Sequence, residues 1–194
     1  MNKNRLEAFS DGVLAIIITI MVLEFKLPHG YDCNAVIPLL PKFLAYILSF
    51  IYIGIYWNNH HHMMHTVKRV NGKMLWANLH LLFWLSLIPF VTAWAGENNF
   101  AAFPMMLYGV ILLCNAIAYY VLQTVIVNHN GKDSDLSKAL GNDLKGKGSI
   151  VLYCIAIGFA NYFPLVSGFI YILVALIWLV PDKRIESIFN AENE

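Results

Sequence analysis

The chain contains 194 residues, of which 59% are hydrophobic and only 13% are charged, and its formal net charge is +1. A soluble domain usually carries about 25% charged residues, so this composition excludes an ordinary soluble domain and indicates an integral membrane protein in a lipid bilayer. Without a basic patch, the near-neutral charge gives no support for a nucleic-acid-binding protein. The three cysteines lack the spacing of a metal site, and we expect core residues without a disulfide at Cys33, Cys114 and Cys154.

Long apolar runs predict the membrane spans, because a helix needs about 20 apolar residues to cross a hydrocarbon core about 30 Å thick. Four runs predict helices over residues 6–27, 42–64, 74–95 and 100–127. The last uncharged block, residues 149–181, is long for one helix and short for two. Asn161, Pro164 and Gly168 interrupt it, which favours two short helices over 148–163 and 165–181. The alternative is one kinked helix and an odd number of spans.

The positive charges decide between these two interpretations, because Lys and Arg concentrate in cytoplasmic loops near the ends of spans. Eleven of the 13 basic residues lie near the termini or in alternate loops, which requires an even number of spans and places both termini in the cytoplasm. These are Lys3, Arg5, Lys68, Arg69, Lys73, Lys132, Lys138, Lys145, Lys147, Lys183 and Arg184. We therefore expect an all-α integral membrane protein with six transmembrane helices, folded as one domain over residues 1–194.

The first span has two different faces. At about 100° per residue, one arc roughly 100° wide forms an aliphatic stripe with a single hydroxyl: Gly12, Ile16, Thr19, Ile20, Leu23 and Leu27. Asp11 falls on the far side, where we expect a buried polar group with protein partners, since a charge there is costly and marks function. Such a stripe is usually a helix interface. Polar anchors on the opposite face favour a symmetric oligomer whose stripes meet at the axis and form a narrow hydrophobic constriction.

Histidines gather at the end of the second span, between His60 and His65. His61 and His65 are four residues apart, so they share a helix face and could bind a divalent metal. Two ligands do not complete a coordination shell, and interfacial histidines can equally bind nothing specific. A divalent-metal transporter that uses the His60–His65 cluster is one alternative function, and a non-conducting membrane scaffold is another.

Polar residues within the spans need partners inside the protein. Asp11, His60 and Asn78 fall near cytoplasmic helix ends, on the same side as Arg5. Such a network either serves packing alone or senses protons, because histidine changes its charge between about pH 5 and 8. No nucleotide-binding glycine loop, nucleophile elbow or pair of catalytic carboxylates occurs in the sequence, so we expect no enzyme activity and no cofactor.

The first span opens with the motif Arg-x-x-x-Phe-Ser-Asp, which consists of Arg5, Phe9, Ser10 and Asp11. Further residues follow in order at Trp57, His60, Asn78 and Pro89. From Arg5 to about Pro89 the chain resembles the transmembrane protein 175 family, the lysosomal potassium channels and their prokaryotic relatives. In that family the animal proteins fuse two six-helix repeats, whereas prokaryotic chains have one repeat and form homotetramers. The resemblance implies a homotetramer in a prokaryotic plasma membrane, with the first helices lining a central pore.

The same resemblance implies a passive channel for potassium and other monovalent cations. The family lacks the Thr-Val-Gly-Tyr-Gly filter of ordinary potassium channels, and so does this sequence. By resemblance, Ile16 forms the pore constriction, Ile20 and Leu23 add further apolar layers, and Thr19 contributes to cation preference. The polar motif residues would form an interhelical hydrogen-bond network. Prokaryotic members are less selective than animal ones, so we expect a modest preference for K⁺ over Na⁺.

Overall fold

The computed structural model describes residues 3–67, 69–131, 134, 136–137, 141 and 143–179. Its first helix, α1 (Lys3–Leu23), leads through a loop and two short 3-10 helices, η1 (Cys33–Ala35) and η2 (Ile37–Leu39), to α2 (Leu40–His65). The chain continues through α3 (Gly72–Leu85), α4 (Ile88–Glu97), α5 (Ala102–Asn130), α7 (Leu144–Ala160) and α8 (Pro164–Leu179). No strand occurs among the described residues, and the all-α class is confirmed.

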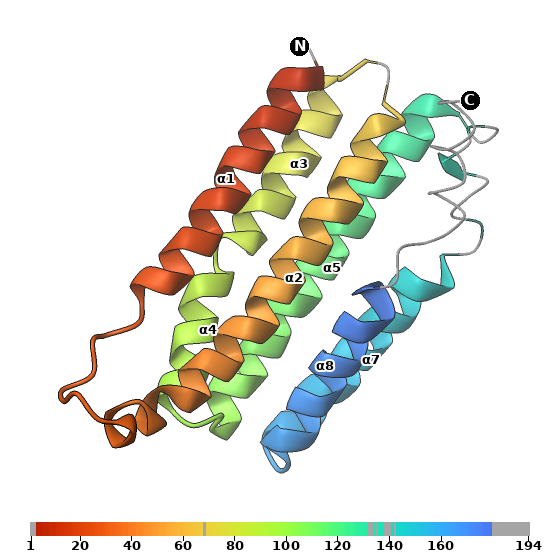
Figure 1. Cartoon of the computed structure of the whole chain (residues 1–194). Helices are drawn as coiled ribbons and strands as arrows, with labels where there is room; N and C mark the ends of the chain where they lie inside the picture. The colour runs from red at the N-terminus through yellow and green to blue at the C-terminus, as the bar shows by residue number, and fades with distance from the viewer. Residues whose placement is uncertain are drawn as a thin grey trace.

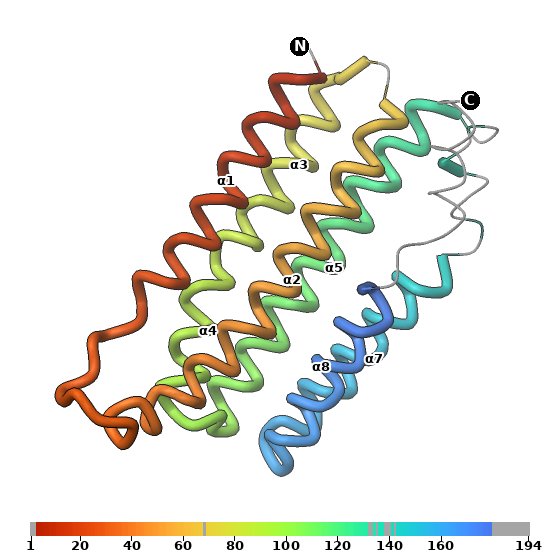
Figure 2. The backbone as a smooth tube through the Cα atoms, in the orientation of Figure 1, coloured from red at the N-terminus to blue at the C-terminus, as the bar shows by residue number. Residues whose placement is uncertain are grey.

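α1 lies at one edge of the helix bundle, and α7 and α8 lie at the other (Figures 1 and 2). α1 packs against α2, α3 and α4, whereas α5 packs against α3, α4, α7 and α8. Fully buried apolar side chains such as Leu81, Ile88 and Leu122 form the core between these helices. This arrangement leaves one side of α1 without a partner in the single chain.

Among the described residues, four segments are long and apolar enough to cross a membrane, and they correspond to the first four predicted spans: Lys3–Leu23, Cys33–His65, Gly72–Glu97 and Ala102–Asn130. When α3 and α4 count as one, the described residues hold six helical segments at the positions of the six predicted spans. α7 has 17 residues and α8 has 16. At about 1.5 Å per residue, each is only about 25 Å long. That these two helices also cross the bilayer stays a prediction.

The last apolar block is divided as expected, because α7 and α8 are separate helices with a turn at residues 161–163 between them. α1, in contrast, ends four residues before its predicted end, so Leu27 lies outside the helix. Pro28 disfavours a helical conformation at the residue before it, and Glu24 and Lys26 interrupt the apolar run. The predicted end of the last span at residue 181 lies outside the described residues, as do Lys68, Lys132, Lys138, Lys183 and Arg184.

The third span is interrupted rather than continuous. α3 ends at Leu85, and α4 begins at Ile88 with Pro89 in its first turn. Proline has no N–H, so the Leu85 carbonyl loses the donor that a continuous helix would supply. The buried Asn115 amide of α5 lies 3.4 Å from the neighbouring Trp84 carbonyl and donates to it. A side chain from another helix thus supplies a donor at the interruption.

The positions of two cysteines differ from the expected core positions. All three thiols are free, but Cys33 and Cys154 are exposed and Cys114 is only partly buried. Cys33 lies in η1, in the loop before α2, and Cys154 lies on the outer side of α7. The prediction of core positions is therefore wrong for Cys33 and Cys154: Cys33 lies in a polar loop, and the apolar run around Cys154 can face lipid as well as protein.

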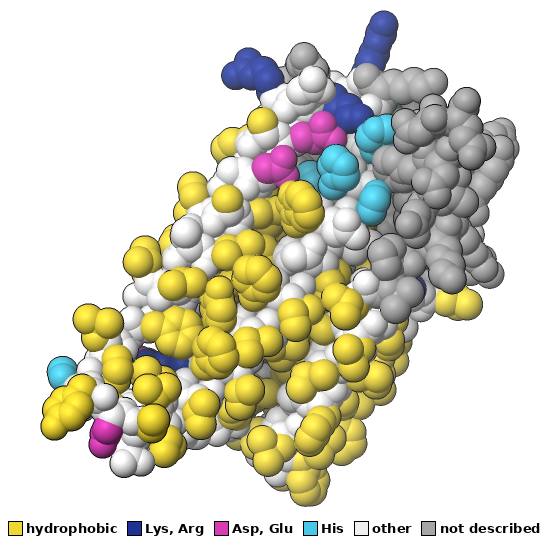
Figure 3. All heavy atoms as spheres, viewed as in Figure 1, with side chains coloured by type: hydrophobic (Ala, Val, Ile, Leu, Met, Phe, Trp, Pro, Cys, Tyr) yellow, Lys and Arg dark blue, Asp and Glu magenta, His cyan; other side chains and the backbone are white. Residues whose placement is uncertain are grey.

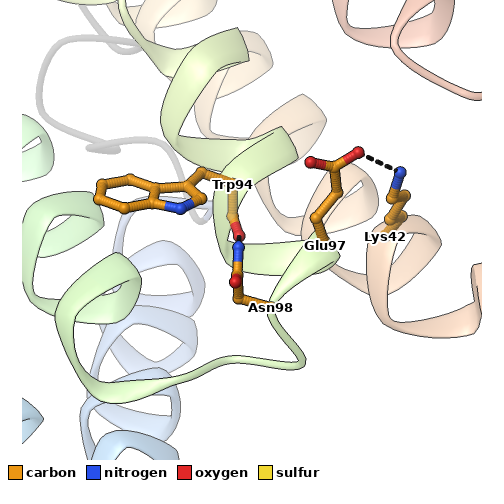
Figure 4. Close-up of polar contacts among 4 residues, drawn as sticks. All are labelled: Lys42, Trp94, Glu97 and Asn98. Atoms are coloured by element: carbon orange, nitrogen blue, oxygen red, sulfur yellow. Dashed lines mark hydrogen bonds and ion pairs between the residues drawn. The ribbon is translucent and has the colours of Figure 1, made fainter.

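α2 and α4 lie very close together at Gly96, where an added Cβ would lie 2.6 Å from the Cα of Lys42. Beside this contact, the Lys42 ammonium and the Glu97 carboxylate form an ion pair 2.7 Å long (Figure 4). The Asn98 amide donates to the Trp94 carbonyl over 2.9 Å and closes the end of α4. Position 96 requires glycine because backbone atoms occupy the space that a side chain would need.

Gly96→Ala is expected to lower the free energy of unfolding by about 1–3 kcal/mol, because the added methyl group must push α2 away from α4. Thermal unfolding of the purified protein in detergent measures the effect. Gly54→Ala on α2 is the matched control, since no atom lies within 4 Å of its added Cβ. Alanine there should be neutral or stabilising by up to about 1 kcal/mol. Equal unfolding midpoints for Gly96→Ala and the unsubstituted protein would contradict the close contact.

Candidate functional site on the first helix

The aliphatic stripe of α1 is uncovered in the single chain. All its members on the helix are exposed, with Ile16 at 59% and Leu23 at 80% of full exposure. The buried side of α1 is formed by a separate set: Leu6, Ser10, Leu14, Ile17 and Met21. An apolar helix face of this length lacks a partner within its own chain, so lipid or another copy must cover it.

Thr19 interrupts the stripe with a hydroxyl. Its oxygen lies 2.7 Å from the Ala15 carbonyl and 3.0 Å from the Ile16 carbonyl, and the hydroxyl donates back to its own helix. The lone pairs of the oxygen stay available on the exposed side. The exposed face of α1 therefore offers a weak acceptor between Ile16 and Leu23.

A buried hydrogen-bond chain ties α1 to α2 and α3. The His60 ring donates from Nε2 to Asn78 Oδ1 over 2.7 Å, and Asn78 Nδ2 donates to Ser10 Oγ over 2.9 Å. The Ser10 hydroxyl in turn donates to the Leu6 carbonyl over 2.9 Å. Ser10 and Asn78 have no exposed surface, and His60 is buried as well. Each of these polar groups has the internal partner that a hydrocarbon environment demands.

Asp11 differs from the expectation. It is exposed rather than buried, and it accepts a 3.0 Å hydrogen bond from the Trp57 indole N–H of α2. The buried polar residue of α1 is its neighbour Ser10, because the buried face is centred on Ser10 and the next residue is turned away by about 100°. The structure thus divides the motif into a buried chain through Ser10 and an exposed bond at Asp11.

Arg5 and Phe9 belong to neither arrangement. Both are exposed, and Arg5 makes no hydrogen bond or ion pair to another residue in the described part of the chain. Eleven residues separate Arg5 from Ile16, which is close to three helical turns. Arg5 therefore lies on the same side of α1 as the stripe, a position that the spacing of the sequence could have revealed.

His61 and His65 of the histidine cluster are exposed on α2, whereas His60 is buried. Figure 3 shows that acidic and histidine side chains gather near one end of the molecule. The His61 ring stacks on Trp57 with 6.3 Å between centroids, and it lies 6.4 Å from the His65 ring. Among the residues that the structure describes, no group of three His, Cys, Asp or Glu side chains is placed to hold a metal ion. His61 and His65 thus bring two rings together without a third ligand from the same part of the chain.

Comparison with known proteins gives consistent matches. The family model of the endosomal/lysosomal potassium channel TMEM175 matches residues 5–89. A potassium channel of Chryseobacterium sp. (strain P1-3) is 57% identical over 186 residues, which cover 96% of this chain and 97% of that protein. The human endosomal/lysosomal proton channel TMEM175 is 34% identical over 86 residues, or 38% of this chain and 17% of the human protein.

A solved structure shares the fold. The crystal structure of a lysosomal potassium-selective channel TMEM175 homolog from Chamaesiphon minutus superimposes with a TM-score of 0.81 at 28% sequence identity. The match covers 93% of this chain and 97% of that one. The likeness therefore extends over nearly the whole chain, beyond the N-terminal half that the family model matches.

Proposed function

This chain belongs to the TMEM175 channel family, and from that premise we propose that it is a passive, potassium-permeable cation channel in the plasma membrane of a prokaryote. Four copies would assemble around the exposed faces of α1, with both termini of each chain in the cytoplasm. Ile16, Ile20 and Leu23 would line the pore. The relatives compared above are named as channels, and the proposed activity includes no catalytic step.

The observation that carries this proposal is the uncovered aliphatic stripe of α1. The opposite side of α1 is anchored to its own chain through Ser10 and Asn78, so the stripe stays free for contact between copies. A closed symmetric oligomer brings identical faces together at its axis. Four such faces around an axis would enclose a narrow apolar passage.

The stripe also fixes the kind of selectivity that we propose. A hydrophobic constriction gates by losing its water, and it has no carbonyl ring to replace the hydration shell of an ion. An ion must shed part of its hydration to pass Ile16, and potassium holds its water less tightly than sodium. With only the Thr19 oxygen close by, the preference for potassium would be modest.

A potassium-flux assay in liposomes tests the proposal. Purified protein is reconstituted into potassium-loaded liposomes, a proton ionophore supplies the balancing charge, and a pH-sensitive dye reports the proton uptake that accompanies potassium efflux. We expect potassium efflux well above that of empty liposomes, with a smaller response to an equal sodium gradient. Protein that is folded and inserted but gives no flux would support a membrane scaffold and overturn the proposal.

Asp11→Ala is expected to reduce the share of tetramer. The charge-assisted hydrogen bond between Asp11 and Trp57 holds α1 against α2 and stabilises this packing by roughly 1–2 kcal/mol in each chain. Its loss in all four copies would let α1 shift and weaken the contacts between copies. We expect a shift to smaller species in size-exclusion chromatography with light scattering, but little change in helix content. Asp11→Asn keeps an acceptor and should retain most tetramer, whereas Trp57→Phe should match Asp11→Ala. An undisturbed tetramer in Asp11→Ala would exclude this role.

A further inference from the structure

A cavity of about 40 Å³ lies between α2, α5, α7 and α8, on the far side of the chain from the α1 stripe. It is larger than the 10–15 Å³ that one water molecule requires. Six of its 13 lining residues are aromatic: Tyr52, Tyr56, Tyr119, Tyr120, Tyr153 and Trp178. The electron-rich faces of such rings attract cations. The cavity is therefore a partly open space with aromatic rings in its wall, and the proposed pore does not use it.

A carboxylate completes the cavity. Asp143 lines it and precedes α7, where its Oδ1 accepts a 3.1 Å hydrogen bond from the backbone N–H of Gly146. Its Oδ2 accepts a 3.3 Å hydrogen bond from the Gln123 amide of α5. The two bonds hold the carboxylate in place at the wall of the cavity. A fixed negative charge beside aromatic rings favours a cationic occupant.

Two of the tyrosines that line the cavity, Tyr56 and Tyr120, have hydroxyls without a hydrogen-bond partner among the described residues, and Tyr56 is the more buried of the two. Tyr56 is 9% exposed, and its hydroxyl makes no hydrogen bond to another residue in the described part of the chain. The neighbouring hydroxyls differ, since Tyr119 donates to the Asn59 carbonyl over 3.3 Å and Tyr153 donates to Tyr52 over 3.2 Å. The Tyr56 hydroxyl oxygen can therefore accept a hydrogen bond from an occupant of the cavity.

The wall of the cavity already accepts an ammonium group from within the chain. The Lys145 ammonium lies 5.1 Å from the centroid of the Trp178 ring. The indole N–H of Trp178 donates to Ser149 Oγ over 2.7 Å, which fixes the orientation of this ring. Trp178 thus combines a fixed orientation with a ring face that can contact an alkylammonium group.

From these contacts we propose that the cavity is a binding site for a small primary alkylammonium ion. The alkyl group packs against the tyrosine rings, the ammonium donates to the Tyr56 hydroxyl, and the Asp143 carboxylate supplies the opposite charge. A bare potassium ion fits less well, because several free oxygen ligands must replace its hydration shell and the two Asp143 oxygens already accept hydrogen bonds from Gly146 and Gln123. An anion is disfavoured by both the carboxylate and the ring faces.

Thermal unfolding of the purified full-length protein in detergent tests this site, with methylammonium chloride as the probe and potassium chloride at equal concentration as the reference. We expect a saturable rise in the unfolding midpoint with methylammonium beyond that with potassium. Asp143→Asn keeps the side-chain acceptor for the Gly146 N–H but removes the charge, and it should weaken apparent affinity at least tenfold (about 1.4 kcal/mol). Tyr56→Phe should weaken it by a similar factor while keeping the ring.

Two further variants separate this site from the proposed pore. Ala116→Leu adds a side chain at a position that lines the cavity, and it should abolish the methylammonium-specific rise. Ile16→Asn alters the stripe of α1 and should leave the rise unchanged. The same rise in Asp143→Asn as in the unsubstituted protein, or a rise that potassium reproduces, would overturn the proposal.

Discussion

Replacing Ile16 with asparagine is expected to raise potassium flux at least about tenfold and to weaken the preference for potassium over sodium. Ile16 is 59% exposed on the uncovered face of α1, and four copies would meet at the constriction. A polar amide lets water wet a passage that isoleucine keeps dry. A tenfold change needs only about 1.4 kcal/mol, which is less than the roughly 1.5–3 kcal/mol associated with one buried isoleucine side chain. Liposome flux with potassium and sodium gradients measures both effects.

Ile155→Asn supplies the matched control for this experiment. Ile155 is 43% exposed and lies on α7, a helix that does not pack against α1. The substitution Ile155→Asn makes the same chemical change as Ile16→Asn, but away from the proposed pore. We expect flux close to that of the unsubstituted protein. If Ile16→Asn assembled normally and conducted unchanged, Ile16 would not line the pore.

Asn78→Leu is expected to lower the free energy of unfolding by about 2–4 kcal/mol. Asn78 is fully buried, and its amide links Ser10 of α1 to His60 of α2 through the two hydrogen bonds described above. Leucine has a similar size, but it leaves both partners without their bonds, and each buried polar group left unsatisfied costs about 1–3 kcal/mol. Thermal unfolding in detergent should therefore show a lower midpoint, together with reduced tetramer.

Asn128→Leu on α5 is the control for Asn78→Leu, because Asn128 is exposed. The same substitution there should change the midpoint little. His60→Gln offers a second check, since an amide can replace the ring as donor to Asn78 and should lose less stability than Asn78→Leu. An unchanged midpoint in Asn78→Leu would show that the buried chain contributes nothing to stability.

Much of the fold follows from the apolar pattern alone. Residues in a bilayer must be apolar over a fixed length of helix, so the first four spans can be recognised from composition without tertiary information. The separation of α7 from α8 could also be predicted, because Asn161 and Pro164 interrupt an otherwise uniform run. The stripe of α1 is likewise a property of helical periodicity, and its exposure agrees with the absence of a partner in the same chain.

The orientation of single polar side chains depends on the tertiary structure. A step of one residue turns a helix by about 100°, and it separates the buried Ser10 from the exposed Asp11. Periodicity alone distinguishes the two faces, but the neighbouring helices decide which face is buried. The donor that Asn115 supplies near the interruption at Pro89 depends in the same way on how α5 packs against α3 and α4.

The cavity beside Tyr56 and Asp143 also belongs to the tertiary structure. Its wall combines residues from α2, α5, α7 and α8, and no local pattern brings these positions together. The sequence by itself determined the membrane class, the helices and the apolar face of α1, because hydrophobic length and periodicity are local properties. Only the packing of distant helices decided the hydrogen-bond partners and the cavity, because those contacts join residues that are far apart along the chain.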